Sequence, residues 1–243
     1  NIESWHVLFP GANDSHLLLN EGFIERYGYR FVWNNRDFEN FDDFLKIFTS
    51  RQRKNIRKER EVIKQFDITF STKEGENLVL EDWNVFFKFY VNTYYQRMQK
   101  PYLNKEFFEL IHCYKKKLRP ILFFASIGDE VIAASLCFRD ELSLYGRHWG
   151  AAKDISGLHF ECCYYQGIEY CIKNRIAFFD PGIQGEYKIR RGFEPKLSNS
   201  YHFILHADFR NAIKRFCADE KKQIMNYFNA CNKYTPIKKE YRI

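Results

Sequence analysis

The chain has 243 residues, of which 45% are hydrophobic and 19% aromatic, a composition typical of a globular protein with a sizeable core. Its net charge of +7 at pH 7 favours anionic partners such as nucleotide phosphates, RNA or acidic membrane. Seven cysteines without C-x-x-C spacing argue against a disulfide scaffold and indicate reduced thiols in a cytoplasmic compartment. No apolar stretch approaches the roughly 18 residues of a membrane span.

The first predicted elements alternate between short strands and helices. The pattern indicates a strand over residues 4–9, a short helix over 14–21 and an aromatic strand over 29–33. Apolar residues then recur at helical spacing from 40 to 66, which predicts one long helix that is broken near Ser50.

From Leu80 onward the pattern is more regular. Two helices are followed by an antiparallel meander of three strands, then a helix, a strand, a short basic helix, another strand and a closing helix. We expect the two helices near residues 80–94 and 107–118, the meander at 121–127, 131–138 and 142–149, and the next helix at 158–174. The following strand is expected at 176–179, the short basic helix after Gly182, the next strand at 201–205 and the closing helix at 208–232.

This order of elements resembles a GNAT domain, an α/β fold in which helices flank a mixed sheet. The sequence of strand, Pro-Gly, short helix, Gly-Phe and strand occurs at residues 5–33 and again at 176–205, which suggests tandem lobes. We therefore expect residues 1–70 to hold the remnant of a first GNAT-like lobe and a long basic helix. Residues 71–207 would form a complete lobe, and 208–243 a C-terminal helix and tail.

Four long strings support a more specific resemblance. They are RQRKNIRKER at 51–60, LYGRHWG at 144–150, LHFECCYYQGIEY at 158–170 and PGIQGEYKIRRGFEP at 181–195. In this order they resemble the FemAB-like predicted N-acyltransferases, a group also described as peptidoglycan biosynthesis/recognition proteins. The resemblance covers almost the whole chain and implies a two-lobed GNAT architecture. Members usually carry more sequence upstream, and this chain begins at Asn1, so we expect a preceding segment.

The chain departs from the family pattern at two positions. The loop that usually reads G-A-Q-G-E-H-K here has Tyr187 in place of the histidine, and the strand motif has His148 where a tyrosine is commoner. An essential histidine at position 187 is therefore not expected.

Residues for the acyl donor are expected where two parallel strands splay apart. Arg147 and Gly150, with Ala152, fit the R-x-x-G-x-A pattern that resembles the superfamily's pyrophosphate loop. Alternatively, Gly150 only punctuates a strand end. Gly182, Gly185 and Lys188 offer a second anion nest, or else a tight strand-to-helix turn.

Three side chains are candidates for proton transfer. Glu161 falls at the centre of the apolar stripe of its helix, where burial would raise the pKa of a carboxylate and suit it to accept a proton from an amine. A structural ion pair with Arg147 or Arg190 is the alternative. Glu186 and His159 are the other candidates, although His159 lies off the stripe.

A stripe of four cations follows the long basic helix. Arg53, Arg57, Arg60 and Lys64 stand at i, i+4, i+7 and i+11, beside the apolar line of Ile56 and Ile63. This spacing predicts either a polyanion-binding groove or a solvated face.

We therefore expect N-acyl transfer from acyl-CoA, as co-substrate, to a small-molecule or peptide amine. The alternatives are an aminoacyl-tRNA-dependent FemAB-type transferase acting on a peptidoglycan precursor and a noncatalytic recognition or RNA-binding module. No metal is expected, because no zinc-site spacing, P-loop or nucleophile elbow occurs in the sequence.

Overall fold

A computed structural model describes residues 2–183 and 185–242, which form two compact units. The first unit consists of the chain up to Phe31 together with Ile183–Ile189 and Phe193–Thr235. The second consists of Val32–Gly182, Arg190–Gly192 and the chain from Pro236 onward. These units do not follow boundaries at residues 70 and 207, and the reading of 1–70 as the remnant of a first lobe stays a prediction.

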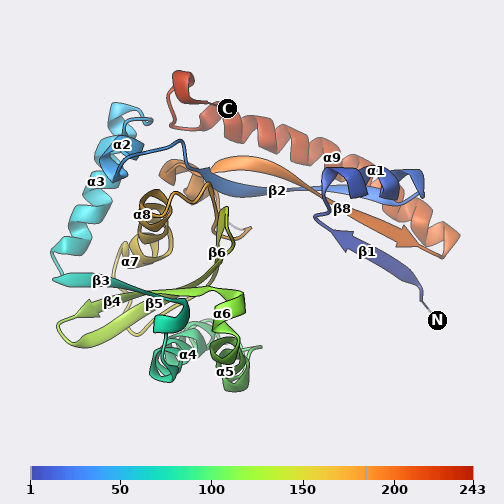
Figure 1. The fold of residues 1–243 in the computed structure, drawn as a ribbon. Helices are drawn as coiled ribbons and strands as arrows, with labels where there is room; N and C mark the ends of the chain where they lie inside the picture. The colour runs from blue at the N-terminus through green and yellow to red at the C-terminus, as the bar shows by residue number, and fades with distance from the viewer. Residues whose placement is uncertain (1, 184, 243) are drawn as a thin grey trace. The chain divides into compact units, whose positions relative to one another are not determined.

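The first unit is built on three strands and two helices. Strand β1 (Ser4–Leu8) pairs antiparallel with β8 (Glu194–Ile204), which lies between β1 and β2 (Ile24–Asn34). Helix α1 (Ala12–Asn20) joins β1 to β2, and the long helix α9 (Ala207–Tyr234) packs against β8 (Figure 1). The core of this unit gathers Ile24, Ile204, Cys217 and Ile213.

The second unit holds a mixed sheet with the strand order β7-β6-β5-β4-β3. The strands are β3 (Ile68–Glu74), β4 (Pro120–Ile127), β5 (Glu130–Arg139), β6 (Ser143–Ala151) and β7 (Phe178–Asp180). All neighbours pair antiparallel except β6 and β7, which run parallel, and the last two residues of β2 also pair with β7. The fold class expected from the sequence, a mixed sheet flanked by helices, is confirmed.

Helices cover both faces of this sheet. Leu122 and Phe124 of β4 pack against α4 (Leu80–Tyr95) and α5 (Lys105–Cys113). The alternate residues Phe123 and Ala125 face the other way, because successive side chains of a strand point to opposite faces. Phe123 meets the ring of Tyr170 on that side. The helix there begins as α7 (Leu158–Phe160), passes through a π-helical segment at Glu161–Tyr165 and continues as α8 (Gln166–Lys173).

The long basic stretch forms two helices, as the sequence predicts. Asn40 caps α2 (Phe41–Leu45) and Thr49 caps α3 (Ser50–Lys64), and each polar side chain accepts a hydrogen bond from a backbone N–H of the first turn. The second N-cap, Thr49, therefore begins a new helix at Ser50 and interrupts the expected long helix there.

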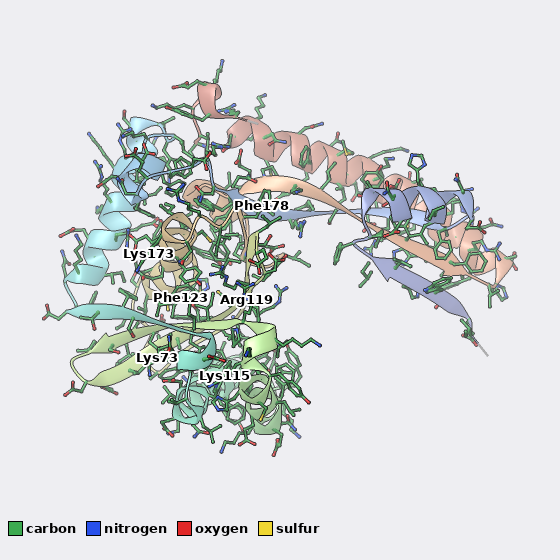
Figure 2. All side chains as sticks on the ribbon, in the orientation of Figure 1. Lys73, Lys115, Arg119, Phe123, Lys173 and Phe178 are labelled. Atoms are coloured by element: carbon green, nitrogen blue, oxygen red, sulfur yellow. The ribbon has the colours of Figure 1, made fainter. Side chains whose placement is uncertain are left out.

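Several elements differ from expectation. Strand β3 was not expected, because its sequence ITFSTKE is polar, as suits a strand at the edge of a sheet. Its Lys73 pairs with Asp82 at 2.6 Å, and Lys115 of α6 (Lys115–Leu118) donates to the carbonyl of Leu78. Figure 2 labels both lysines.

The other differences concern helix type and strand length. The helix expected at 107–118 is split into α5 and α6, and the expected short basic helix is a 3₁₀ turn at Glu186–Arg191. The strands β2 and β8 begin earlier than the patterns at 29–33 and 201–205 indicate. Two further 3₁₀ turns lie at Gly75–Asn77 and Lys239–Tyr241. No helix of the described ranges is long and apolar enough to cross a membrane.

The repeated Gly-Phe dipeptides have the same local structure. Gly22 and Gly192 both have positive φ, at 78° and 87°, and Phe23 and Phe193, which follow them, are both buried. Glycine tolerates this left-handed conformation without steric cost. The two copies of the internal repeat thus have the same local structure at the Gly-Phe dipeptide. They differ at the Pro-Gly dipeptide, because Gly182 has positive φ and Gly11 does not.

Candidate active site

The parallel pairing of β6 and β7 is short. Its register runs from Ser143 opposite Phe178 to Tyr145 opposite Asp180, where β7 ends. Strand β6 continues to Ala151. Ligands of α/β sheets commonly bind beyond the carboxyl ends of parallel strands, so this divergence is the natural place for a site in the second unit.

Arg147 occupies a β-bulge in β6 at this divergence. Leu136 of β5 lies opposite His148 and the next residue, Cys137, lies opposite Gly146, so Arg147 is the extra residue. A bulge removes one residue from the ladder and re-aims its neighbours, and bulges are frequent next to active sites. The exposed guanidinium of Arg147 lies 5.5 Å from the ring centroid of Tyr145.

Close packing requires glycine at Gly146. A Cβ atom there would lie 3.2 Å from the Cα of Pro181, in the turn that follows β7. In the same turn the backbone N–H of Gly182 donates to the carboxylate of Asp180 at 3.0 Å, and Gly182 has a φ of 93°. Gly182 therefore meets the requirement of a tight turn, which was one of its two interpretations.

Gly150 has a packing reason in the structure that does not involve phosphate, and its place in a phosphate loop stays a prediction. Gly150 lies within β6, opposite Ala134 of β5, so its backbone belongs to the sheet ladder. A Cβ atom at this position would lie 2.2 Å from the carbonyl oxygen of Phe89 on α4. The glycine is thus explained by the close approach of α4 to the strand.

A cavity of about 200 Å³ lies at the carboxyl end of β6. The end of α4, the end of β6, the following loop and the start of α7 surround it. Its lining includes Arg97, Trp149, Lys153, Asp154 and His159. Arg97, Lys153 and Asp154 are exposed residues of this lining, and Lys153 also pairs with Glu130 at 3.2 Å, whereas His159 is half-buried.

His159 is the one sequence-predicted catalytic residue that lines this cavity. Its ring packs edge-on against Trp149 of β6 and Tyr164 of the same helix, with centroid separations of 5.5 and 5.4 Å. Glu161 stands two residues further along, and residues at this spacing do not face each other on a helix. The two candidates therefore do not share a site.

Glu161 is held in an ion pair with Arg60 of α3. The Nε and Nη2 atoms of Arg60 donate to the two carboxylate oxygens at 3.0 and 2.7 Å, and Gln166 donates to one of them at 2.9 Å. Glu161 is only 3% exposed. The contacts are those of the structural ion pair, but the expected partners Arg147 and Arg190 were wrong.

Arg60 joins this carboxylate to a second one. Its Nη1 donates to Glu169 at 2.7 Å, and its guanidinium lies 4.3 Å from the ring centroid of Phe41. Burial opposes the charge, but the hydrogen bonds and charges of Glu161 and Glu169 outweigh it and raise the pKa of Arg60 above its ordinary value. Arg60 thus remains charged in a largely desolvated place.

The neighbouring Glu59 forms a parallel contact. It accepts hydrogen bonds from Tyr165 at 2.6 Å and from Arg191 at 3.0 Å, and the guanidinium of Arg191 lies 3.4 Å from the ring centroid of Phe160. Burial and the charge of Glu59 raise the pKa of Tyr165. Two consecutive residues of α3, the acidic Glu59 and the basic Arg60, therefore hold the helix to the π-helical segment.

The remaining cations of the expected stripe are exposed or half-buried. Arg57 pairs with Asp42 at 2.9 Å and Lys64 with Glu61 at 3.2 Å, while Arg53 donates to Ser50 at 3.4 Å. Surface pairs of this kind contribute little and are easily exchanged. Because Arg60 turns inward, the expected stripe of four cations is reduced to Arg53, Arg57 and Lys64.

The loop residues Gly185, Glu186 and Lys188 belong to the first unit. A Cβ atom on Gly185, whose φ is 109°, would lie 2.3 Å from the ring of Tyr187. Glu186 accepts a hydrogen bond from Tyr227 of α9 at 2.8 Å, and Lys188 is only 2% exposed. A buried Lys188 does not offer the surface cation that the expected anion nest requires. Gln184, in the same loop, lies outside the described residues.

His148 lies in a group of tyrosines that sequence reasoning missed. Its ring centroid is 5.2 Å from that of Tyr90 and 6.2 Å from that of Tyr102, and Tyr94 is 5.0 Å from Tyr90. Burial and the nearby charge of Arg147 lower the pKa of His148. The sequence signal was its departure from tyrosine in a motif strand, which marks the position but not its surroundings.

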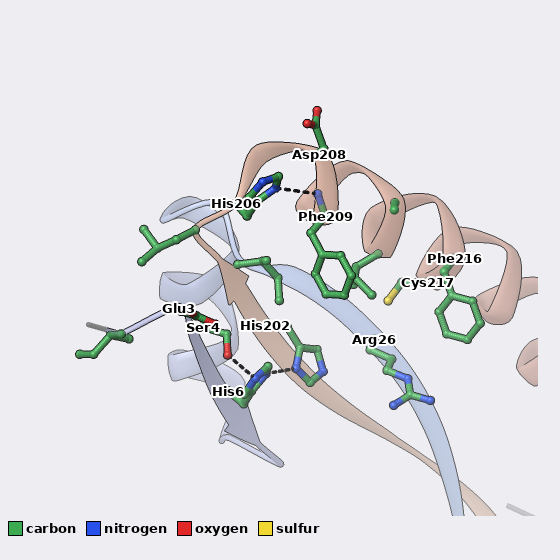
Figure 3. A pocket seen from close by; sticks show the side chains of 15 residues that line it. Glu3, Ser4, His6, Arg26, His202, His206, Asp208, Phe209, Phe216 and Cys217 are labelled. Carbon is green, nitrogen blue, oxygen red and sulfur yellow. Dashed lines mark hydrogen bonds between the residues drawn. The ribbon is translucent and has the colours of Figure 1, made fainter.

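The first unit contains a larger cavity, of about 1150 Å³, between β1, β8 and the start of α9 (Figure 3). On its wall the Nδ1 atoms of His6 and His202 lie 2.7 Å apart, so one of them donates and the other accepts. Ser4 and Ser200 complete a chain of hydrogen bonds at 2.9 Å on either side. Burial, His6 and Arg26 lower the pKa of His202. None of these residues was predicted as a site from the sequence, where His202 was considered only with His206 as zinc-site spacing and rejected.

Comparison with known families shows the family to which the chain belongs. A family described as "Peptidogalycan biosysnthesis/recognition", FemAB-like, matches residues 1–239. The chain belongs to the FemAB-like family. This membership confirms the resemblance of its four motif strings and supports a transferase-like role related to peptidoglycan.

Solved structures share the FemAB-like fold at low identity. L-PGS from Bacillus licheniformis has a TM-score of 0.57 at 12% identity, over 86% of this chain and 71% of that one. FemX has a TM-score of 0.58 at 12% identity, over 84% and 71%. The C-terminal domain of a putative lysylphosphatidylglycerol synthetase from Agrobacterium fabrum has 0.58 at 9%, over 88% and 71%. No curated protein matches the sequence.

The loop motif of this chain differs from the expected family pattern at Tyr187. Tyr187, which replaces the family's usual histidine, places its ring directly against Gly185. An aromatic ring in that position fills space beside the loop backbone. Tyr187 is itself 40% exposed, so its ring lies over the loop at the surface.

Proposed function

We propose that the chain is an N-acyltransferase that moves an acyl group from acyl-CoA to an amine. The observation that carries this proposal is the divergence of β6 and β7 at the Arg147 bulge. Further along β6, at its carboxyl end, lies the cavity lined by Arg97, Lys153 and His159. Membership of the FemAB-like family supports the reaction class. Acyl transfer needs donors aimed at a developing oxyanion, and backbone released from a strand ladder can supply one.

The donor residues have distinct tasks in this scheme. The thioester lies against β6 at the bulge, where the backbone of Arg147 faces its carbonyl oxygen. Arg147, Arg97 and Lys153 supply positive charge for the phosphates of the donor. His159 lies in the cavity and orients the group that enters it. No metal takes part in this scheme.

The acceptor is a small-molecule or peptide amine. The family description and the name of FemX favour an amine of a peptidoglycan precursor. A protein of similar fold is named as a putative lysylphosphatidylglycerol synthetase, so other acceptors occur among the names of similar structures. We place the reaction in the cytoplasm, where thiols stay reduced; no disulfide joins cysteines in the part of the chain that the structure describes.

An aminoacyl-tRNA donor is the second candidate, and one observation favours it. The cavity at the carboxyl end of β6 has a volume of about 200 Å³, below the roughly 300–1,000 Å³ of pockets that enclose drug-sized ligands. Such a space suits one aminoacyl group whose carrier stays outside. A noncatalytic recognition module remains the third candidate, because the family description includes recognition.

Native mass spectrometry of the protein purified from cell extract separates these donors. Retained acyl-CoA supports the first candidate, retained tRNA supports the second, and neither supports a recognition module. The binding of acetyl-CoA is then measured by calorimetry in Arg147→Ala and in Arg51→Ala, an exposed cation on α3 that serves as the matched control. Unchanged affinity in Arg147→Ala would contradict the proposed cleft. Gly185→Val is less informative, because its strained φ and the ring of Tyr187 would distort the loop without any donor.

A further inference from the structure

The tyrosine group around His148 is a cluster of rings in mutual contact, of which one member reaches the surface. Tyr90 is buried, Tyr94 and His148 are half-buried, and Tyr102 is 68% exposed. The ring of Tyr102 lies 5.8 Å from that of Tyr94 and 6.2 Å from that of His148. We call these four residues the aromatic box.

Separate elements hold the box in place. Tyr90 and Tyr94 come from α4, Tyr102 from the connection to α5, and His148 from β6 directly after the bulge residue Arg147. The hydroxyl of Tyr90 accepts a hydrogen bond from the backbone N–H of Leu103 at 3.2 Å, which fixes the connection that carries Tyr102. The box therefore stands beside the proposed point of acyl transfer.

The chemistry of the box suits an amine that arrives as a cation. Faces of tyrosine rings attract ammonium groups, and the attraction strengthens as water is excluded. Within the part of the chain that the structure describes, no hydrogen bond or ion pair occupies the imidazole of His148. In contrast, Glu161 is committed to Arg60 and Glu186 to Tyr227.

We propose that the aromatic box binds the ammonium group of the acceptor and that His148 is the catalytic base that deprotonates it. This proposal rests on the proposed N-acyl transfer. One proton passes from the ammonium nitrogen to His148, and the amine then attacks the thioester carbon. The N–C bond forms, the C–S bond breaks and the second proton of the nitrogen goes to the leaving thiolate. His148 returns its proton to solvent.

The charges around His148 keep it ready for this task. Burial and Arg147 of the same strand lower its pKa, so the imidazole is neutral at pH 7 and able to accept a proton. Tyr90 and Tyr94 of α4 and Tyr102 face it, and burial raises the pKa of Tyr94 and Tyr102, so these stay uncharged. The other nearby charge is Arg97, at the end of α4.

The binding step is tested without any acyl transfer. The imidazole proton resonances are followed by NMR, with His148 assigned by its absence in His148→Phe, while n-butylammonium or tetramethylammonium is added. We expect both cations to shift the His148 resonance and Tyr102→Ala to weaken their binding roughly two- to fivefold, the size of an exposed cation–π contact. His16→Gln, on the exposed face of α1, is the control and leaves both unchanged. If neither cation shifts the His148 resonance, the proposal that the aromatic box binds an ammonium group is wrong.

The catalytic step is tested by thiol release from acetyl-CoA with n-butylamine as acceptor. His148→Phe and His148→Gln are expected to lower kcat by about 10² to 10⁴ and to remove the acidic limb of the pH profile, with acetyl-CoA affinity retained. A variant that keeps the rate and the limb overturns the role of His148. If the unaltered protein transfers no acyl group, the proposed function fails, and the NMR shifts alone then support or overturn the box.

Discussion

Glu161 illustrates how one side chain can satisfy a sequence criterion for catalysis and yet serve structure. It lies on the buried stripe of its helix, where a carboxylate is unusual. Arg60 and Gln166 occupy both of its oxygens. Buried carboxylates need such partners because desolvation disfavours their charge.

Glu161→Gln is therefore expected to destabilise the fold by about 1–3 kcal/mol, the cost of leaving part of a buried charged group unpaired. Arg60 keeps Glu169, which limits the loss. Urea unfolding measures the effect, with Glu61→Gln on the exposed side of α3 as the control, expected within about 0.5 kcal/mol. Unchanged stability together with a 10²- to 10⁴-fold fall in transfer rate would instead restore Glu161 as the base.

Strand β6 is the element on which the site depends. Its bulge turns Arg147 outward and shifts the alternation, so that His148 faces the tyrosines of α4 and Trp149 faces His159. Gly150 then lets α4 approach the strand.

Gly150→Ala should lower the free energy of unfolding by about 1–3 kcal/mol, because the added Cβ would overlap the backbone of Phe89. Thermal and urea unfolding check this value. Gly11→Ala is the matched control, since Gly11 has a φ of −67° and the nearest atom to an added Cβ is 3.8 Å away. Normal stability of Gly150→Ala with loss of acyl-CoA binding would favour the phosphate-loop interpretation.

Helix α3 allows a quantitative test of the aminoacyl-tRNA alternative. Each phosphate contact contributes about −0.7 on single strands or −0.9 on duplex to the slope of log affinity against log salt. With Arg60 turned inward, Arg53, Arg57 and Lys64 would give a slope of about −2 to −3. The double variant Arg53→Ala, Arg57→Ala should reduce this slope to about −0.7 to −0.9, measured by fluorescence anisotropy with tRNA.

Lys58→Ala is the control for this measurement, because Lys58 is exposed on α3 away from the stripe. An equal loss in Lys58→Ala would indicate nonspecific attraction by the whole helix. A slope that stays the same in the double variant would place any RNA contact elsewhere.

At the scale of the molecule, two histidines with lowered pKa make stability depend on pH. Burial comes first among the causes for both His148 and His202. The unfolded chain takes up protons at its ordinary histidine pKa of 6.5, while the folded chain takes them up at lower pH. The stability is therefore full above pH 6.5 and falls as pH drops below 6.5 toward the folded pKa values.

Urea unfolding between pH 7.5 and 5 is expected to show this loss, and His148→Phe and His202→Gln should each reduce it. His16→Gln, whose side chain is exposed, should retain it. A second loss is expected below about pH 4.5, where Glu220, whose pKa the hydrogen bond from Arg26 lowers, becomes protonated. Stability that is constant from pH 7.5 to 5 would contradict the assignment of buried neutral histidines.

The sequence by itself determined the family, the fold class and most helices and strands. It also predicted a break near Ser50, which the structure explains by the N-cap at Thr49. It missed β3, whose polar edge-strand sequence carries little hydrophobic alternation. The residues of the candidate site were located only in part: Arg147 and His159 are at the divergence and the cavity, whereas Gly150 is a packing residue.

Only the tertiary structure decided the partners of these residues. Arg60 and Glu161 are 101 positions apart in the chain, and no local pattern relates them. The bulge at Arg147 depends on the register between β5 and β6, and the aromatic box depends on α4 reaching β6 beside it. Periodicity and caps act over a few residues and can be read along the chain, whereas register and side-chain pairing are fixed by packing between segments that are distant in sequence.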